Sequence, residues 1–345
     1  MRRMKAAVYY DKEDIRLEEM PVPKIGDGEV LVQMKVCGVC GSDLMDWYIK
    51  PRAPIVLGHE PVGTISEKGV KTNGFELGER VFVHHHVACL KCHYCLHGDF
   101  TLCEEFHKTR IVPGGFAEKI RVPNRNLAID TLKIPDQVTD EEATFIEPLG
   151  CCLRALKKCK IQIGDVVAVL GCGGTGALHI AVSKLLGASM VVASDFFEER
   201  LRRAKEFGAD VIINAKEESL RDVVQSVSGG RGADVVVVTA PSISAYSNAL
   251  ETVRRGGTVC AFAPTEPGKT LQVSPKGLFF SEVKITPSYS TSHVETREAL
   301  ELIRNRRVDV AGMVTSRFAL SEVEAALKAA REDMSNLKVI VVNEQ

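Results

Sequence analysis

The feature that most constrains the fold of this chain is a glycine-rich turn. Residues 171–176 read Gly-Cys-Gly-Gly-Thr-Gly and fit the pattern G-x-G-x-x-G. An apolar run at 166–170 ends directly before the turn, and a helical pattern at 175–186 begins inside it. In dinucleotide-binding folds the glycines permit a tight turn, a close approach of the pyrophosphate and close helix–strand packing. The helix N-terminus then presents free N–H groups to the phosphates. The context predicts a dinucleotide-binding domain.

An acidic residue is expected about 20 positions further on, where it binds the adenosine ribose. Asp195 stands there, directly after the apolar run at 190–194. A carboxylate at this position would repel a 2′-phosphate, so the sequence favours NAD over NADP. Arg200 follows and is expected to stack on adenine, although it would also tolerate a 2′-phosphate. The residues predicted to bind the dinucleotide are Gly171, Gly173, Gly174, Thr175, Gly176, Asp195 and Arg200.

The hydrophobic pattern changes near residue 164. Before it, short β-rich segments alternate with glycine-containing turns, which is typical of an antiparallel sheet or small barrel. After it, short apolar runs alternate with helix-length amphipathic segments, which is typical of a parallel α/β sheet. Helices at 295–304 and 321–332 and a strand at 338–342 are expected to follow. The six apolar runs match the strand number of a doubly wound dinucleotide fold and lie at 166–170, 190–194, 211–213, 234–239, 258–263 and 283–286.

Length and charge limit the classes of function. The chain has 345 residues, which suggests two domains, and its 45% hydrophobic content allows a large core. A formal net charge of −1, without a dense Lys/Arg block, argues against a nucleic-acid partner. No apolar run approaches the roughly 20 residues of a membrane span, and no signal peptide is recognisable at the start. We therefore expect a cytoplasmic protein without a membrane or nucleic-acid partner.

Four of the eleven cysteines form a compact cluster. Cys89, Cys92, Cys95 and Cys103 fall within fifteen residues, close enough to surround one soft metal ion. Four thiolates with no open position are typical of structural zinc. An iron–sulfur cluster is the alternative, because C-x2-C-x2-C also opens a ferredoxin motif, but the last spacing is longer than in that motif. Two disulfides are less favoured in a cytosolic chain.

A second group of potential metal ligands is scattered along the first half of the chain. Cys40 is followed by Ser42, His59 by Glu60, and Glu147 lies where the β-rich part ends. One cysteine, one histidine and one or two carboxylates around a water make an open catalytic zinc site. Taken singly, each of these residues would also fit a buried or solvated structural role.

With these motifs the sequence resembles the zinc-dependent medium-chain dehydrogenases over nearly its whole length. The pair Glu147-Pro148 resembles the sorbitol (polyol) and threonine dehydrogenase branch, whereas the alcohol dehydrogenases of the family carry a cysteine near that position. The segments that carry the resemblance are 38–43, 56–60, 78–81, the four cysteines, 114–118, 147–149, and 171–176 with Asp195.

The resemblance implies an α/β protein with two domains. Residues 1–150 would form a β-rich, GroES-like catalytic domain, a partly open barrel with a structural zinc lobe at 84–110. Residues 151–289 would form the doubly wound Rossmann domain that binds NAD. Residues 290–345 would return to the catalytic domain.

The resemblance also assigns roles in a catalytic zinc site. The residues that match Cys40 and His59 bind the ion, and those that match Glu60 and Glu147 bind it or hold its water. Asp43 would orient His59 from behind. With the four-cysteine site, this implies two Zn²⁺ ions per chain, one catalytic and one structural.

The reaction implied by the family is the oxidation of an alcohol with hydride transfer to NAD. Ser42 would pass the proton outward, and Met45 replaces the histidine that often ends this relay. His86 matches a histidine that threonine dehydrogenases carry near the substrate. The predicted substrate is a secondary alcohol of a polyol or cyclitol, with L-threonine 3-dehydrogenase as the alternative. The predicted catalytic residues are Cys40, Ser42, His59, Glu60, Glu147 and His86.

The run at 283–286 should form an edge strand of the dinucleotide sheet, and an apolar edge invites pairing. In the family that edge joins two subunits, which implies a homo-oligomer and, for polyol dehydrogenases, a homotetramer. From another class of function, a non-catalytic zinc-binding or iron–sulfur protein stays an alternative.

Overall fold

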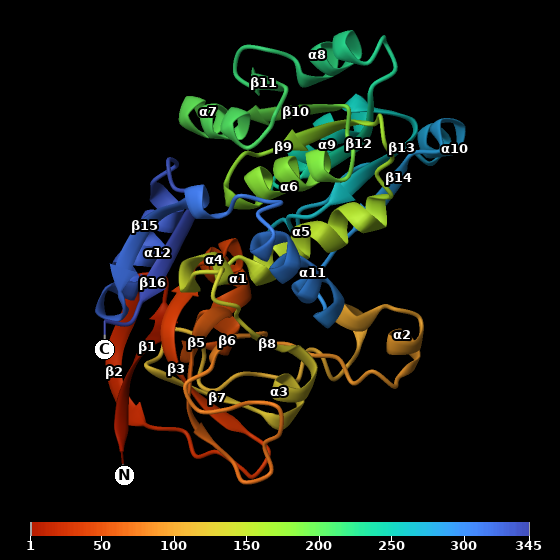
Figure 1. The fold of residues 1–345 in the computed structure, drawn as a ribbon. Helices are drawn as coiled ribbons and strands as arrows, with labels where there is room; N and C mark the ends of the chain where they lie inside the picture. Colours follow the sequence, from red (N-terminus) through yellow and green to blue (C-terminus); the bar gives the residue numbers. More distant parts are fainter. Residues whose placement is uncertain (1, 345) are drawn as a thin grey trace. The chain divides into compact units, whose positions relative to one another are not determined.

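The computed structural model describes residues 2–344, and the chain divides into two compact units. The first unit comprises Met1–Gly150 together with Ser290–Gln345, and the second comprises Cys151–Tyr289. The chain therefore leaves the first unit once and returns to it. Figure 1 shows both units with their helices and strands labelled.

The first unit is rich in β-structure. Its strands are β1 (Arg3–Asp11), β2 (Asp14–Pro21), β3 (Val30–Gly38), β4 (Ile55–Val56), β5 (Glu60–Lys68), β6 (Arg80–Val83), β7 (Lys119–Val122), β8 (Thr131–Lys133), β15 (Val314–Ala319) and β16 (Lys338–Val342). Its α-helices are α1 (Asp46–Ile49), α2 (His93–Leu96), α3 (Asn124–Asp130), α4 (Asp140–Ala143), α11 (His293–Arg304) and α12 (Val323–Glu332). Its 3₁₀ helices are η1 (Gly41–Leu44), η2 (Lys50–Arg52), η3 (Phe100–Leu102), η4 (Ala311–Met313) and η5 (Leu320–Glu322).

Two sheets form the first unit. The larger sheet has the strand order β15-β16-β3-β5-β6-β8, with β7 paired to β3, and the smaller has the order β2-β1-β4. The pairs β3–β5, β5–β6 and β16–β3 are antiparallel, as predicted for the β-rich half, but β15 and β16 pair in parallel. The last strand of the chain thus lies beside β3 and completes the sheet.

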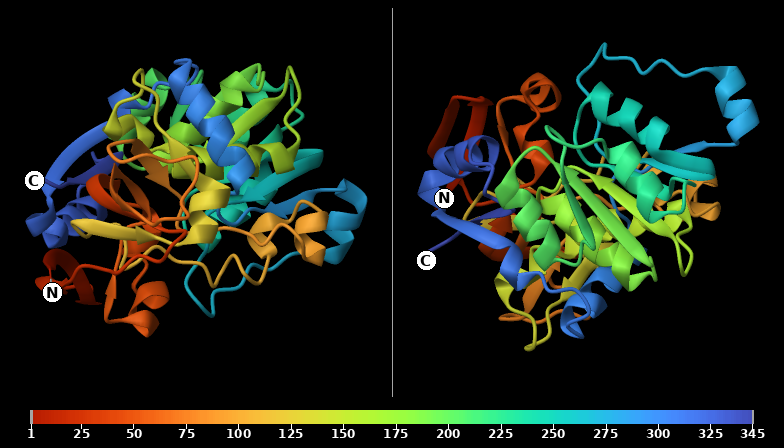
Figure 2. Two further views of the ribbon diagram at one scale, coloured as in Figure 1. Left: turned by 60° about the horizontal axis from the view of Figure 1, so that its bottom comes forward. Right: turned by 90° about the horizontal axis from the view of Figure 1, so that it is seen from above.

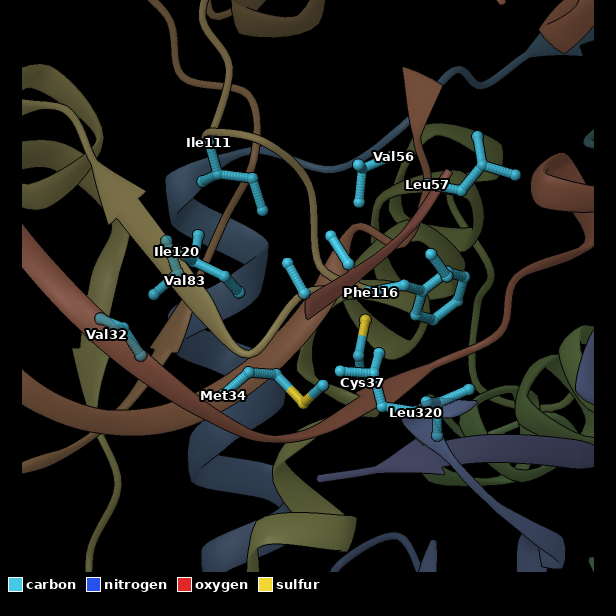
Figure 3. Packing of buried hydrophobic residues seen from close by; sticks show 14 of the residues in the cluster. Val32, Met34, Cys37, Val56, Leu57, Val83, Ile111, Phe116, Ile120 and Leu320 are labelled. Carbon is cyan, nitrogen blue, oxygen red and sulfur yellow. The ribbon is translucent and has the colours of Figure 1, made fainter. Parts of the chain in front are cut away.

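A large apolar cluster forms the core of the first unit. Figure 3 shows side chains from β3, β6 and β7 meeting those of the loops before β5 and β7 and of the C-terminal segment. Their alternation along the strands is the period-two pattern that places one face of each strand in the core. The residues labelled there are Val32, Met34, Cys37, Val56, Leu57, Val83, Ile111, Phe116, Ile120 and Leu320.

The second unit alternates strands and helices. Its strands are β9 (Val166–Leu170), β10 (Met190–Asp195), β11 (Val211–Asn214), β12 (Ala233–Val238), β13 (Val253–Ala261) and β14 (Lys284–Pro287). Its helices are α6 (Gly174–Leu185), α7 (Glu198–Glu206), α8 (Leu220–Val227), α9 (Ile243–Thr252) and α10 (Pro275–Ser281), and α5 (Ile146–Cys159) enters it from the first unit.

The six strands form one parallel sheet with the order β11-β10-β9-β12-β13-β14. This order reverses between β9 and β12, as in the doubly wound fold predicted from the apolar runs. Helices α8 and α9 pack on the face that carries Val166, Ala168 and Leu170. The views in Figure 2 show helices on both faces of this sheet. The predicted edge position of the last strand, β14, is confirmed.

Several predicted bounds differ from the observed ones. The helix expected at 244–254 ends at Thr252, because Val253 already pairs with Ala233 in the sheet. The helix expected at 321–332 begins as 3₁₀ and becomes α-helical at Val323. Helix α10 was not predicted, since Pro275 and Gly277 are weak helix formers. Among the described residues, no helix has the length and apolar character needed to cross a membrane.

Candidate active site and metal centres

Two antiparallel strands bring the first predicted ligands together. β3 ends at Gly38 and β5 begins at Glu60, and these two residues are partners in the strand register. Cys40 follows the end of β3 as the N-cap of η1, and His59 directly precedes β5. One ligand atom from each of Cys40, His59 and Glu60 lies within 4.8 Å of the others. The register therefore creates a three-residue cluster from segments twenty residues apart.

Asp43 holds this cluster from one side. Its Oδ2 accepts a hydrogen bond from the N–H of Cys40 (3.0 Å), and its Oδ1 lies 3.3 Å from Nδ1 of His59. This contact leaves Nε2 of His59 for a metal ion. In carboxylate–histidine–metal triads, one ring nitrogen usually binds the carboxylate and the other binds the metal. Oγ of Ser42 lies 3.5 Å from the same Nε2. Burial alone would lower the pKa of His59, but Asp43 and Cys40 raise it well above its usual value. The negative groups beside His59 therefore favour a positive charge at this cluster.

Glu60 is held by a lysine from the far end of the chain. Because β16 pairs with β3 through Ile340 and Gly38, Lys338 at the start of β16 lies beside Glu60. Its Nζ donates to Oε2 of Glu60 and, at 3.2 Å, to the carbonyl oxygen of Val39. Both side chains are buried, with 7% exposure for Lys338 and 0% for Glu60. Burial is the largest single effect on the pKa of Lys338 and lowers it, but Glu60, Cys40 and Glu147 together raise the pKa above its usual value, so the ammonium stays charged.

The other oxygen of Glu60 indicates what the cluster can bind. Oε1 is buried and has no hydrogen-bond partner among the described residues. Burial has the largest effect on the pKa of Glu60 and raises it, and the carboxylate of Glu147 raises it as well. Lys338 and His59 act in the opposite direction, but the pKa stays above its usual value. Glu147 lies buried in the first turn of α5, outside the three-residue group. A thiol, an imidazole and an orphaned carboxylate oxygen are the donor set of an open zinc site, so these residues fit zinc.

The four cysteines converge in the lobe that contains α2 and η3. Their sulfur atoms lie within 4.8 Å of one another, with Sγ–Sγ distances of 3.5 Å for Cys92–Cys95 and 4.0 Å for Cys89–Cys95. All eleven cysteines are free thiols in the structure, so the disulfide alternative is not observed. A small apolar cluster around Phe106 supports the lobe.

The electrostatics of the lobe fit a metal ion as well. Backbone N–H groups, that of Lys91 first, lower the pKa of Cys89 to about 6. Burial, followed by hydrogen bonds with Cys92 and Cys103, raises the pKa of Cys95 to about 12. Four adjacent thiols cannot all ionise without a cation, and a bound Zn²⁺ would take the place of their protons. The donor set is therefore that of a closed zinc site.

The glycine turn of the second unit has the geometry of a phosphate-binding turn. Gly171 has φ +99, and a Cβ there would lie 2.6 Å from Oγ1 of Thr239. A Cβ on Gly176 would overlap the carbonyl oxygen of Gly171. At Gly173 the space is open, and the nearest group to an added Cβ would be the guanidinium of Arg200 at 3.8 Å. The turn leaves room for a ligand above Gly173, where α6 begins with Gly174 and Thr175.

Asp195 is fixed beside this turn at the end of β10. Its Oδ2 accepts from the N–H of Cys172 (2.7 Å), and its Oδ1 accepts from those of Phe196 (2.7 Å) and Phe197 (3.1 Å). Arg200 lies 4.0 Å from the same carboxylate. The structure thus brings every residue predicted to bind the dinucleotide to one edge of the parallel sheet, at the carboxyl ends of β9 and β10. This is the position at which such sheets bind ligands.

The three consecutive histidines after β6 have different environments. Nδ1 of His84 lies 2.7 Å from Oδ2 of Asp130, and both side chains are fully buried. His86 is also buried, and its Nδ1 donates to the carbonyl oxygen of Thr109 (2.8 Å). Burial, followed by the nearby guanidinium of Arg110, lowers the pKa of His86 to about 2. The ring that was predicted to lie near the substrate is thus hydrogen-bonded to Thr109.

The middle histidine, His85, is the one that contacts the cluster of Cys40, His59 and Glu60. Its ring centroid lies 4.9 Å from that of His59. Burial, followed by His86 and His59, lowers the pKa of His85 well below its usual value. Sequence reasoning missed His85 and Lys338. The signals were weak: one residue of a histidine run, and one lysine at the start of an apolar strand.

Comparison with known proteins gives the same picture for both halves of the chain. The family "Alcohol dehydrogenase GroES-like domain" matches residues 26–136, and the family "Zinc-binding dehydrogenase" matches residues 174–305. A sorbitol dehydrogenase of Bacillus subtilis (strain 168) is 31% identical over 98% of this chain and 97% of its own length. An alcohol dehydrogenase of Geobacillus stearothermophilus is 36% identical over 88% and 90%. An L-threonine 3-dehydrogenase of Mesorhizobium japonicum is 29% identical over 98% of both chains.

Solved structures share the whole fold. A crystal structure from Sinorhizobium meliloti 1021, bound to NADP, superposes with a TM-score of 0.87 at 26% identity and covers 99% of this chain and 100% of its own. The N-terminal GroES-like and C-terminal Rossmann-type parts are therefore both represented among known structures.

Proposed function

The chain belongs to the zinc-dependent medium-chain dehydrogenases, and from this premise we propose that it oxidises a secondary alcohol of a polyol or cyclitol to a ketone, with NAD as the hydride acceptor. It is an alcohol dehydrogenase-type oxidoreductase. The observation that carries the proposal is the cluster of Cys40, His59 and Glu60, whose ligand atoms converge within 4.8 Å. We further propose two zinc ions per chain, one in this cluster and one in the four-cysteine lobe.

The roles of the residues follow from their contacts. A bound zinc ion supplies Lewis-acid polarisation of the alcohol oxygen, and NAD supplies the hydride acceptor. Asp43 orients His59 through Nδ1. Ser42 lies next to Nε2 of His59 and is placed to accept the proton of the alcohol and pass it to water. Because Met45 replaces the usual relay histidine, we propose that the proton leaves from Ser42 to bulk water.

Asp195 supports NAD rather than NADP. Its carboxylate faces the glycine turn through the N–H of Cys172, and a negative charge there opposes a 2′-phosphate. Arg200 lies between Asp195 and the open space above Gly173, where it can stack on adenine or contact phosphate. A comparison of KM for NAD and NADP tests this choice, and a lower KM for NADP would reject it.

Two further proposals concern substrate and location. L-threonine is the alternative substrate, favoured by relatives named as threonine dehydrogenases. Against it, the Nδ1 of His86 is already used by Thr109. A cytoplasmic location is proposed because eleven free cysteines suit a reducing compartment.

The decisive experiment replaces Cys40 by alanine. We expect turnover with polyols to fall at least about 1000-fold, while NADH binding, followed by nicotinamide fluorescence, stays unchanged. Elemental analysis should fall from two zinc ions per chain to one. Cys151→Ala, a partly exposed cysteine outside the cluster, is the matched control and should keep both activity and zinc. Full activity in Cys40→Ala would reject the mechanism, and visible absorbance of the purified wild type would indicate an iron–sulfur protein instead.

A further inference from the structure

The segment that follows β6 is fixed from both sides. Nδ2 of Asn126 donates to the carbonyl oxygens of His84 and His85, at 3.0 Å each. The N–H of His84 donates to the carbonyl oxygen of Asp130 (3.1 Å), and its ring is paired with the side chain of the same residue. After the segment, the N–H of Val87 donates to Oγ1 of Thr109 (2.9 Å). The backbone of His85 is therefore held without help from its own ring.

The ring of His85 differs from its two neighbours in its hydrogen bonding. The ring of His84 is bound to Asp130 through Nδ1 but has a buried, unpartnered Nε2, and the ring of His86 is bound to Thr109. The ring of His85 has no hydrogen bond at either nitrogen among the described residues. Nδ1 of His85 is buried and unpartnered among the described residues, whereas the residue as a whole is partly exposed. A buried imidazole nitrogen without a partner costs about 1–3 kcal/mol, so natural sites usually satisfy it with a ligand or water.

The position of this ring points to the substrate. Its centroid lies 4.9 Å from that of His59, and His59 is also partly exposed. Nε2 of His85 is not among the buried atoms, so it is the ring nitrogen that a ligand can reach. With the reacting oxygen bound beside His59, as proposed above, the 4.9 Å between the two rings is short enough for a polar group on the neighbouring carbon to meet His85.

The charges around the cluster indicate which polar group fits. Cys40 and Glu60 belong to the cluster, Asp43 contacts His59, and the carboxylate of Glu147 acts on Glu60. These groups would balance the charge of the proposed Zn²⁺ ion, so a neutral group fits beside it, and a hydroxyl can both donate and accept. An imidazole offers it either one donor or one acceptor.

We propose that His85 binds the hydroxyl group adjacent to the carbinol that is oxidised, and that it thereby selects vicinal diols over monohydric alcohols. This inference rests on the proposed function and names the part of the substrate that the site recognises beyond the reacting oxygen. A site that hydrogen-bonds a substrate hydroxyl discriminates strongly against the analogue that lacks it, because its own polar group is then left unpaired.

A matched pair of substrates tests the proposal. trans-Cyclohexane-1,2-diol and cyclohexanol share ring and carbinol and differ by one vicinal hydroxyl. We expect the wild type to prefer the diol in kcat/KM by at least about tenfold. His85→Phe, which keeps a planar ring without nitrogen, should lower kcat/KM for the diol at least about tenfold and change that for cyclohexanol less than about threefold. His85→Asn, which keeps a polar side chain, should restore part of the preference.

Two further measurements separate recognition from structural damage. Binding of the diol to the enzyme–NADH complex, followed by nicotinamide fluorescence, should weaken in His85→Phe by the same factor as kcat/KM, while zinc content stays at the wild-type value. His107→Phe, an exposed histidine of the same lobe, should change neither substrate. If phenylalanine prevents folding, His85→Val removes the same nitrogens from a smaller side chain and answers the same question.

The outcomes are distinguishable. Equal losses on both substrates, or no loss on either, would overturn the role of His85 and leave the proposed function intact. A wild type without preference for the diol would also overturn it. A wild type that oxidises neither these alcohols nor any polyol would reject the proposed function and this inference together.

Discussion

Glu60 and Lys338 form a buried ion pair between residues that are 278 positions apart. The carboxylate contributes one oxygen to this pair, and its other oxygen is unpartnered at the catalytic cluster among the described residues. Lys338 therefore decides how Glu60 is held. Its charge also offsets part of the negative charge of the pocket.

Replacing Lys338 by methionine should be costly. The change leaves the Glu60 carboxylate buried without its cation, and we expect a loss of about 3–5 kcal/mol in the free energy of unfolding. Urea denaturation of the purified protein measures it. Lys269→Met, at an exposed position, is the control and should stay within about 0.5 kcal/mol. The double variant Glu60→Gln/Lys338→Met should recover at least about 1 kcal/mol of the loss, and strict additivity would contradict the pair's role.

At this scale the sequence predicted some candidate site residues and not others. Cys40, His59 and Glu60 were predicted only as a set, from their order along the chain and the family resemblance, because each alone would also fit a structural role. Lys338 was not, because a lysine beside an apolar strand is usually solvated, and its burial follows only from the register of β16 against β3. His85 was not predicted because it lies in a run of three histidines. Only tertiary contacts decide which of the three rings is left for a ligand.

At the scale of elements, the turn between β9 and α6 contains glycines with different roles, one in folding and one in ligand binding. Gly176 packs against the backbone of Gly171, whereas Gly173 faces open space. We therefore expect Gly176 to be required for folding and Gly173 to be required for binding of the dinucleotide.

Two alanine substitutions should show this division. Gly176→Ala forces Cβ onto a carbonyl oxygen and should cost about 1–3 kcal/mol in unfolding free energy. Gly173→Ala makes only ordinary contact with Arg200, but Gly173 is the N-cap of α6, where alanine is less favourable than glycine, so we expect a cost of about 0.5–1 kcal/mol. Its methyl group would instead occupy the phosphate position, so we expect NADH affinity, measured by fluorescence titration, to fall at least about tenfold. Unchanged affinity in Gly173→Ala would place the pyrophosphate elsewhere.

Helix α4 begins with a capping box, and the glutamate of this capping box also pairs with an arginine that follows α11. Oγ1 of Thr139 accepts from the N–H of Glu142 (3.2 Å), and Oε2 of Glu142 accepts from the N–H of Thr139 (2.8 Å). Arg306, just after α11, pairs with the other carboxylate oxygen. Burial would raise the pKa of Glu142, but the N–H of Thr139 and the guanidinium of Arg306 lower it below its usual value of 4.5.

This pKa shift predicts a pH dependence of stability. Because the folded pKa is lower than the unfolded one, the contribution is fully present above about pH 4.5 and is lost as pH falls through the folded pKa. Glu142→Gln should therefore cost about 1 kcal/mol at pH 7 and progressively less below pH 4.5. Denaturation curves from pH 7 to pH 4 measure the difference. Glu13→Gln, on an exposed turn, should give no such trend, and a pH-independent Glu142→Gln effect would contradict the charge-based account.

The local sequence pattern predicts some helices and strands better than others. The parallel strands β9, β10 and β12 were predictable because both of their faces are buried, which leaves continuous apolar runs. β2 was missed, since its side chains are mostly exposed or half-buried and polar. The parallel pairing of β15 with β16 was also missed, because it depends on α12 between them rather than on either strand's own sequence.

At the scale of the whole molecule, one edge of the parallel sheet has the properties of an interface. β14 is the last strand of the sheet and pairs only with β13 among the described strands. Beside it, α10 presents Phe279 at 76% and Phe280 at 68% exposure, and Ile285 on the strand is 38% exposed. Such an edge pairs readily with another strand, and a two-fold axis would let two copies of β14 pair with each other.

We expect light scattering to give at least twice the chain mass of 37.7 kDa, with the homotetramer as the proposed state. Ile285→Glu places a charge in the paired edge and should shift the mass toward that of one chain at micromolar concentration. The opposite edge strand, β11, offers a matched control, because Ile212 is similarly exposed at 36%. Ile212→Glu should leave the mass unchanged, since that edge is not expected to meet a partner. A wild-type protein with the mass of one chain would refute the assembly, whereas dissociation by Ile212→Glu alone would assign the interface to the wrong edge of the sheet.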